Sequence, residues 1–94
     1  MTANVIYKYR LETTDDQQIV LPVGARILCV QTQDEIPCLW VQQDEDRHEK
    51  ERHHIRIYGT GHWMAMDPGV YIGTYQLRNG GLVFHVYQQS VSPV

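Results

Sequence analysis

The sequence predicts an all-β domain, either a small antiparallel sandwich or an open barrel of six to seven short strands. Short apolar or alternating segments, rich in β-branched and aromatic residues, recur along the chain and are separated by Gly, Pro and Asn turn signals. No segment keeps a helical period for more than one or two turns. Because chains divide into domains only at about 250–300 residues, the 94 residues are expected to form one domain, residues 1–94.

The first half of the chain predicts four strands. The run of four apolar residues from Ile27 to Val30 is apolar on both faces, which is typical of a central strand covered on both sides. A short polar link joins it to the next apolar run, so we expect an antiparallel hairpin. The strands are expected at residues 4–11, 19–21, 25–33 and 38–41.

The second half predicts three further strands. Residues 42–52 are the most hydrophilic part of the chain and have no apolar stripe, so we expect a mobile loop. Asn79-Gly80 is a strong hairpin signal between two strands rich in β-branched and aromatic residues. The strands are expected at 53–58, 70–77 and 82–87, followed by a polar tail at 88–94.

Charge and composition narrow the function classes. A net charge of -3 and a pI near 5.9 give no basic field, so nucleic acid is an unlikely partner and no membrane association is expected. Residues 1–4 lack the features of a signal peptide, and we expect a cytoplasmic protein. Cys29 and Cys38 are interpreted as reduced thiols, and no cofactor is predicted.

Several motifs resemble a family of small proteins encoded by bacteriophages and by bacterial genomes that carry prophages. The motifs are LPxGAxILxVQxQ at 21–33, PCLW at 37–40, IxGTGH at 57–62, YIGTxQL at 71–77 and LVFH at 82–85. The resemblance spans about residues 4 to 88, and residues 42–52 and 63–66 fit it least. It implies a phage-related setting and an accessory role on host machinery or host defences. Since the family carries no assigned activity, the resemblance transfers no catalytic residue.

The turn that follows the 53–58 strand is the strongest candidate site. Gly59, Thr60, Gly61 and His62 are expected to form a cup of backbone N–H groups that suits a phosphate or carboxylate, with Arg56 adding positive charge. The alternative is a glycine-rich strand end that only turns a sheet corner. It is not a P-loop, since the lysine and the following helix are missing.

Next to this turn, four large side chains predict an interface. Tyr58, Trp63, Met64 and Met66 surround the glycines, where burial is difficult, and Tyr and Trp dominate binding hot spots. Many aromatic residues of a small β domain must instead belong to the core. We therefore expect a surface for a partner protein or for homo-oligomerisation at this turn.

Two further patterns are weaker. Zinc would need three or four convergent ligands, and most of the five histidines are interpreted as surface residues, so no metal site is predicted. A hydrolase would use His62 or His85 as base, with Thr60, Thr74 or Cys38 as nucleophile and Asp67 as orienting group, but no catalytic motif surrounds them. No catalytic residue is therefore assigned.

The leading hypothesis is a phage-related accessory binding protein that acts on a host factor or host defence through the turn at residues 59–62 and its neighbours. The first alternative is sequestration of a small nucleotide-like anionic ligand in the same turn. The second alternative is a histidine-based or metal-assisted hydrolase.

Overall fold

A computed structural model describes residues 4–94, and these residues form strands and turns without a helix. The all-β prediction is therefore confirmed. Residues 1–3, which belong to the predicted domain 1–94 and to the N-terminus without signal-peptide features, lie outside the described residues. The strands are β1 (Asn4–Arg10), β2 (Asp16–Pro22), β3 (Arg26–Gln33), β4 (Ile36–Asp44), β5 (Lys50–Gly59), β6 (Val70–Leu77) and β7 (Leu82–Pro93).

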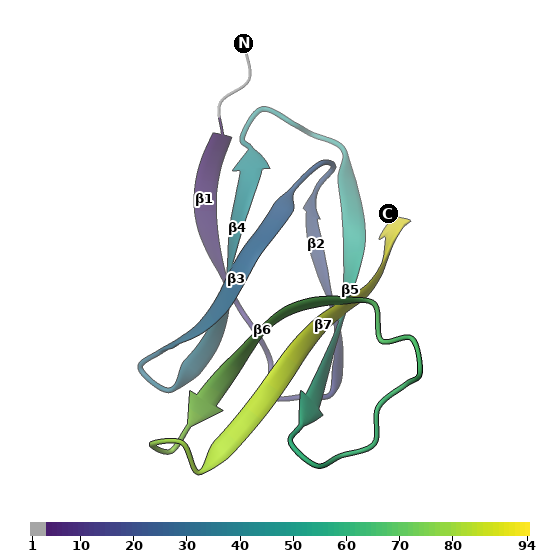
Figure 1. Cartoon of the computed structure of the whole chain (residues 1–94). Helices are drawn as coiled ribbons and strands as arrows, with labels where there is room; N and C mark the ends of the chain where they lie inside the picture. The colour runs from purple at the N-terminus through teal and green to yellow at the C-terminus, as the bar shows by residue number, and fades with distance from the viewer. Residues whose placement is uncertain (1–3) are drawn as a thin grey trace.

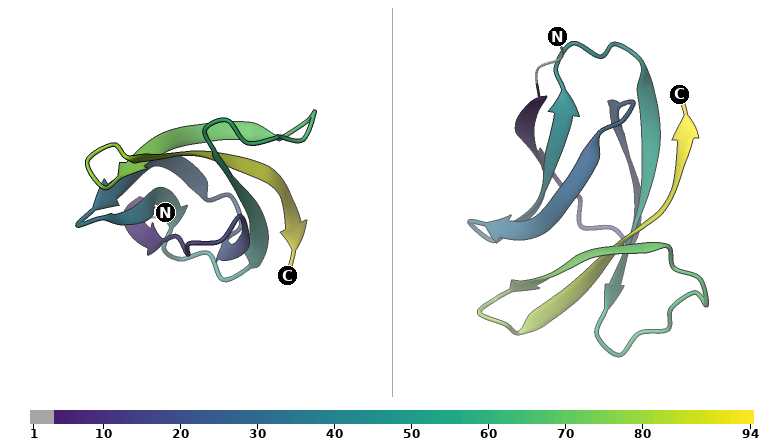
Figure 2. Two further views of the ribbon diagram at one scale, coloured as in Figure 1. Left: turned by 90° about the horizontal axis from the view of Figure 1, so that it is seen from below. Right: turned by 45° about the horizontal axis from the view of Figure 1, so that its top comes forward.

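The strands form two antiparallel sheets that pack as a sandwich. One sheet has the order β1-β4-β3 and the other has the order β2-β5-β7-β6 (Figure 1). The end view in Figure 2 shows β6 and β7 as one layer over β3 and β4. Among the strands that the structure describes, every pairing within a sheet is antiparallel.

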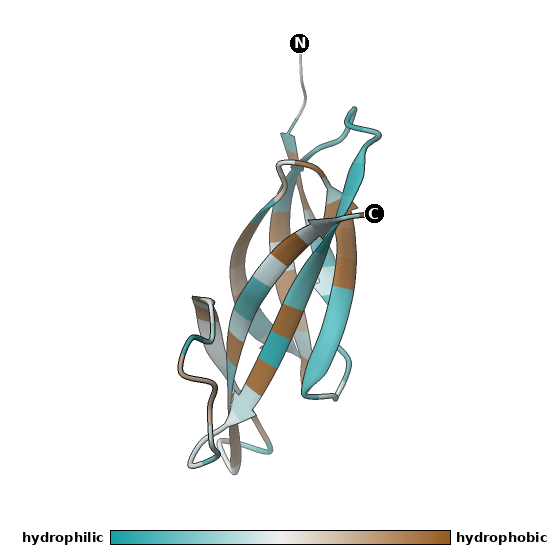
Figure 3. Cartoon of the chain, turned by 90° about the vertical axis from the view of Figure 1, so that its right-hand side faces the viewer, coloured by the Kyte–Doolittle hydropathy of each residue, from teal (hydrophilic) through white to brown (hydrophobic). Residues whose placement is uncertain are grey.

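The core lies between the sheets and is made by alternate residues of the strands. The bands of hydropathy along the strands in Figure 3 follow this alternation. Leu39 and Val41 of β4 are fully buried on one side of the core, and Leu21, Ile55 and Val86 of β2, β5 and β7 are buried on the other. Burying one such aliphatic side chain stabilises the fold by about 1.5–3 kcal/mol.

The sandwich is nearly closed along one side, where β3 approaches β6 across the two sheets. Gly73 makes this approach feasible, because a Cβ atom at that position would lie 2.8 Å from Cγ1 of Val30. β6 also carries a bulge here, as its register to β7 shifts between Tyr71 and Gly73. The absence of one side chain thus lets two edge strands pack together.

The position of β3 corrects one prediction. The apolar run Ile27–Val30 predicts a central strand, but β3 is an edge strand, and β4 is the central strand of its sheet. The run is apolar throughout because it contains a bulge between Ile27 and Cys29, where Leu28 is the extra residue and stays exposed. A bulge breaks the alternation of faces, so the pattern imitates a strand that is covered on both sides.

Both predicted hairpins are confirmed. β3 pairs with β4 through a turn at Asp34 and Glu35, and β6 pairs with β7 through a turn that contains Asn79. Asp34, Glu35, Arg78 and Asn79 all have positive φ. These backbone angles match the turns that best continue the twist of a hairpin.

The extents of the polar loop and of the polar tail differ from prediction. β4 continues to Asp44 and β5 begins at Lys50, which leaves only residues 45–49 of the predicted loop 42–52 outside strands. Most of the predicted tail 88–94 belongs to β7, which pairs with β5 as far as Pro93. Strand pairing is made by backbone groups, so a neighbouring strand can extend the ladder through polar residues that have no apolar pattern.

Candidate functional site

The predicted turn forms where β5 ends. The Thr60 N–H donates to the Val83 carbonyl at 3.3 Å, and the His62 N–H donates to the Gly59 carbonyl at 3.1 Å. Gly61 has a φ of 86°, an angle that glycine adopts without strain. A Cβ atom at Gly59 would lie 2.9 Å from Cε1 of His62, so the imidazole lies over Gly59 in a tight turn.

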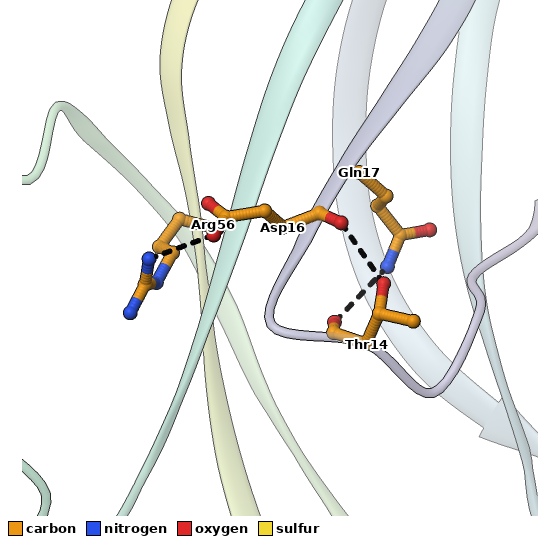
Figure 4. Close-up of polar contacts among 4 residues, drawn as sticks. All are labelled: Thr14, Asp16, Gln17 and Arg56. Carbon is orange, nitrogen blue, oxygen red and sulfur yellow. Dashed lines mark hydrogen bonds and ion pairs between the residues drawn. The ribbon is translucent and has the colours of Figure 1, made fainter.

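This geometry limits what the turn can offer an anion. Two of its N–H groups, those of Thr60 and His62, already donate to carbonyl oxygens. Arg56 is turned toward another partner, because its Nη1 lies 2.9 Å from Oδ2 of Asp16 (Figure 4). Its guanidinium also lies 5.0 Å from the centre of the Tyr58 ring. The structure brings Gly59 to His62 into one turn, but it does not add the charge of Arg56 to that turn.

The segment after the turn is exposed. Trp63 and Met66 are 97% and 101% accessible to solvent, and Met64 is 42% accessible. At the end of this segment the chain returns to the sheet at Gly69, whose φ is 93° and where a Cβ atom would lie 2.2 Å from the Gln88 carbonyl oxygen. The loop of residues 60–69 is therefore fixed at both ends and presents its apolar side chains between them.

Tyr58 differs from the other three predicted interface residues. It is 4% exposed and packs edge-on against Tyr87, with the ring centres 5.8 Å apart. Tyr58 lies on the outer face of its sheet, where a side chain on a central strand can still be covered by long neighbours. It is thus a buried support next to the loop and has little surface for a partner.

Sequence reasoning missed a row of contacts across the same outer face. Tyr87 packs against Tyr71 with the ring centres 5.3 Å apart, and the Tyr71 hydroxyl lies 2.5 Å from Oγ1 of Thr74. The imidazole of His85 lies between two threonines, with Nδ1 2.9 Å from Oγ1 of Thr74 and Nε2 2.8 Å from Oγ1 of Thr60. The sequence contains no signal for this row, because it depends on which strands are neighbours and in what register.

The remaining histidines and cysteines do not converge. His53 is buried on the inner face, with Nδ1 3.4 Å from Oε1 of Gln88, whereas His85 faces outward. Within residues 4–94, no three His, Cys, Asp or Glu side chains are close enough to hold a metal ion. Cys29 and Cys38 are free thiols.

A cavity that the sequence did not indicate opens at the end of the sandwich near the two hairpin turns. It has a volume of about 530 Å³, within the range typical of small-molecule sites. Burial of Tyr75 in its wall raises the pKa of that hydroxyl above the ordinary value, so the ring stays neutral. The lining residues are Thr13, Thr14, Asp15, Glu35, Ile57, Tyr75, Leu77, Arg78, Leu82 and Phe84.

Together, the fold and the loop define a class of protein, a small antiparallel β sandwich with a fixed loop that exposes apolar side chains. Residues 2–93 match the model of the family described as Domain of unknown function (DUF7352), and the chain belongs to this family. No curated protein and no solved structure matches the chain. Within residues 4–94, no helix is long and apolar enough to cross a membrane.

Proposed function

We propose that this protein is a binding module that holds a partner protein through the loop of residues 60–69. The observation that carries the proposal is the nearly complete exposure of Trp63 and Met66. A large apolar side chain in water contributes little to the stability of its own fold, whereas Trp is enriched among the residues that dominate binding free energies.

The way the loop is held supports the same function. Its first residues are bonded to β7 and to the end of β5, and Gly69 packs against the backbone of β7 at Gln88. A loop that is already ordered loses less conformational entropy when it binds, so more of the contact free energy appears as affinity. The outer-face contacts from Tyr58 to Tyr71 provide a rigid support beside it.

The resemblance to proteins of phages and prophages guides the proposal for the partner. We propose a host protein, either part of the host machinery or of a host defence, met in the cytoplasm. The partner surface would offer an apolar pocket for Trp63 and a neighbouring apolar area for Met66.

The test is site-specific photo-cross-linking followed by affinity measurement. A benzophenone amino acid at position 63 should cross-link one partner in bacterial cells, which mass spectrometry identifies. The control position is Val20, which is also apolar and exposed but pairs with Arg52 on β5, seven residues or about 23 Å from Gly59. With the purified partner, Trp63→Ala should raise the dissociation constant by about 30-fold or more, as expected for a hot-spot residue. Val20→Ala should leave the dissociation constant unchanged.

Equal cross-linking from positions 63 and 20, or unchanged affinity of Trp63→Ala, would contradict the use of this loop. Light scattering during size-exclusion chromatography checks the partner. A mass of 11.0 kDa is expected for the free protein. A stable dimer that cross-links to itself through position 63 would make the partner a second copy of the chain and would overturn the proposal of a host protein.

The second candidate function is the histidine-based hydrolase, and one observation favours it. Nε2 of His85 lies 2.8 Å from Oγ1 of Thr60, within the reach of a base that activates a nucleophile. For this role Nε2 would accept the Thr60 proton while Nδ1–H donates to Thr74. Among residues 4–94, no carboxylate bonds to His85, and neither Thr60 nor His85 lines the cavity described above.

An activated-ester assay tests the hydrolase. If Thr60 is a nucleophile, p-nitrophenyl acetate should acylate it, mass spectrometry should locate the acyl group there, and His85→Gln should lower the rate by at least about 100-fold. Thr74→Ser keeps the hydroxyl next to Nδ1 and should retain most of the rate. Hydrolysis no faster than that of Thr60→Val removes this candidate.

A further inference from the structure

The cavity at the end of the sandwich has an apolar floor supplied by one sheet. Ile57 and Tyr75 are 5% and 6% exposed, and the Phe84 ring packs on Tyr75 with the ring centres 5.4 Å apart. Leu77 and Leu82 continue the same wall at the β6–β7 hairpin. An apolar body that enters this space would bury its surface against these side chains, and this removal from water favours binding.

The mouth of the cavity is fixed by hydrogen bonds between segments that are distant in sequence. The Arg78 N–H donates to Oε1 of Glu35 at 2.8 Å, which ties the β6–β7 turn of one sheet to the β3–β4 turn of the other. The Ile57 N–H donates to the carbonyl of Asp15 at 2.8 Å. Thr14 is held from the other side, since its hydroxyl donates to the Asp16 carbonyl and its own carbonyl accepts from Gln17 (Figure 4).

Backbone strain is concentrated at the same place. Within residues 4–94, the four non-glycine residues with positive φ are Asp34, Glu35, Arg78 and Asn79, and all lie in the two turns beside the mouth. A left-handed conformation is unfavourable for a residue with a Cβ atom, and Glu35 has neither the short side chain of Asn nor the freedom of Gly. The carboxylate of Glu35 offsets part of this cost because it binds the opposite turn.

The charges at the mouth select the kind of ligand. The lining includes two acidic residues, Asp15 and Glu35, and one basic residue, Arg78, so the rim carries a net negative formal charge. A carboxylate ligand would meet repulsion from two acids, whereas an ammonium group would meet attraction from both. The Tyr75 and Phe84 rings below the rim supply an apolar surface for the body of such a ligand.

We propose that this cavity binds a small hydrophobic amine, with the ammonium group between Asp15 and Glu35 and the apolar body over Ile57, Tyr75 and Phe84. The site is separate from the loop of residues 60–69, and the proposal does not depend on the protein partner. It adds a ligand of a stated chemical class to a protein whose surface loop suggests only a macromolecular partner.

The test compares three probes with the same ten-carbon chain, namely decylammonium, decanol and decanoate, below the concentrations at which they form micelles. Each is titrated into the ¹⁵N-labelled protein, and amide shifts give the site and the dissociation constant. Decylammonium should bind most tightly, decanol less tightly and decanoate least tightly. The amides that shift should be those around the cavity, and those of residues 63–66 should remain unchanged.

Charge variants then locate the ammonium group. Glu35→Gln and Asp15→Asn should each weaken decylammonium binding about two- to fivefold, as expected for an exposed ion pair, and leave decanol unchanged. Glu35→Gln retains an oxygen that can accept from the Arg78 N–H, so the tie between the two turns is kept. Asp46→Asn removes a carboxylate from the β4–β5 loop and is the matched control.

A variant that fills the mouth of the cavity provides the last control. Leu82→Trp places a larger side chain at the mouth and should abolish binding of all three probes, while the same spectra show that the fold is retained. Decanoate binding as tight as decylammonium binding, shifts outside the cavity, or no binding of any probe would each overturn the proposal.

Discussion

The loop of residues 60–69 and the cavity at the hairpin end are built from the same kinds of side chain but present them in opposite ways. Trp63 and Met66 are directed into solvent, whereas Ile57 and Tyr75 are nearly covered and form a concave floor. The difference follows from the chain around them. Loop residues have no strand opposite, while cavity residues alternate inward on paired strands. Large apolar residues in sequence therefore do not tell a convex surface from a concave one.

The two regions also differ in how their backbones are held. The loop is fixed at its ends by glycines and by hydrogen bonds to its own sheet. The mouth of the cavity is held by a bond between the two sheets, from Arg78 to Glu35, and by turns with strained backbone angles. The first arrangement suits the presentation of side chains to a large partner, and the second suits a shaped site for a small one.

The largest expected effect is on the free energy of unfolding, to which the cavity floor should contribute much more than the loop. Ile57→Ala should lower the free energy of unfolding by about 2–5 kcal/mol, because it removes buried methylene groups and enlarges a space that the core cannot refill. Trp63→Ala should change it by no more than about 0.5 kcal/mol, since the indole is exposed. Guanidinium chloride denaturation measures both.

A loss above about 1 kcal/mol for Trp63→Ala would show that the indole packs on the protein, which would break the comparison. A loss below about 1 kcal/mol for Ile57→Ala would show that the floor of the cavity collapses easily and is not preformed.

A smaller effect compares Gly73, where β6 meets β3, with Gly59, next to the start of the loop. Gly73→Ala should cost about 1–3 kcal/mol, because the new methyl group would lie 2.8 Å from Val30, a buried and branched side chain. Gly59→Ala meets the His62 ring at 2.9 Å, but this ring is exposed and can move, so the cost should stay below about 1 kcal/mol. Thermal unfolding of the two variants gives the ranking.

The reverse ranking would mean that the His62 ring is fixed over Gly59 more firmly than β3 is packed on β6. The turn at residues 59–62 would then be the rigid part of the molecule, and the approach of the two edge strands would be the adaptable part.

Much of the fold could be predicted from the sequence, because strand patterns and turn residues are local signals. The alternation in β5 and the Asn79-Gly80 signal identified strands and a hairpin that the structure confirms. The errors arose where pairing or burial depends on distant residues. The bulge in β3 imitated a central strand, and the polar end of β7 gained its strand conformation from pairing with β5.

The candidate site was predicted only in part, for the same reason. The glycines of residues 59–62 are visible in sequence, and so is the apolar segment that follows them. The burial of Tyr58, the diversion of Arg56 to Asp16 and the two hydroxyl partners of His85 all depend on strand order.

By itself, the sequence determined that this chain is a β domain with a glycine turn and an apolar loop after β5, because these features depend on residues within a few positions of one another. Only the tertiary structure decided which strands lie side by side outside the two hairpins, that Gly73 lets β3 meet β6, and that Glu35 reaches Arg78 to frame a cavity. The last two outcomes each join residues 43 positions apart, and strand order and register carry no local signature in the sequence.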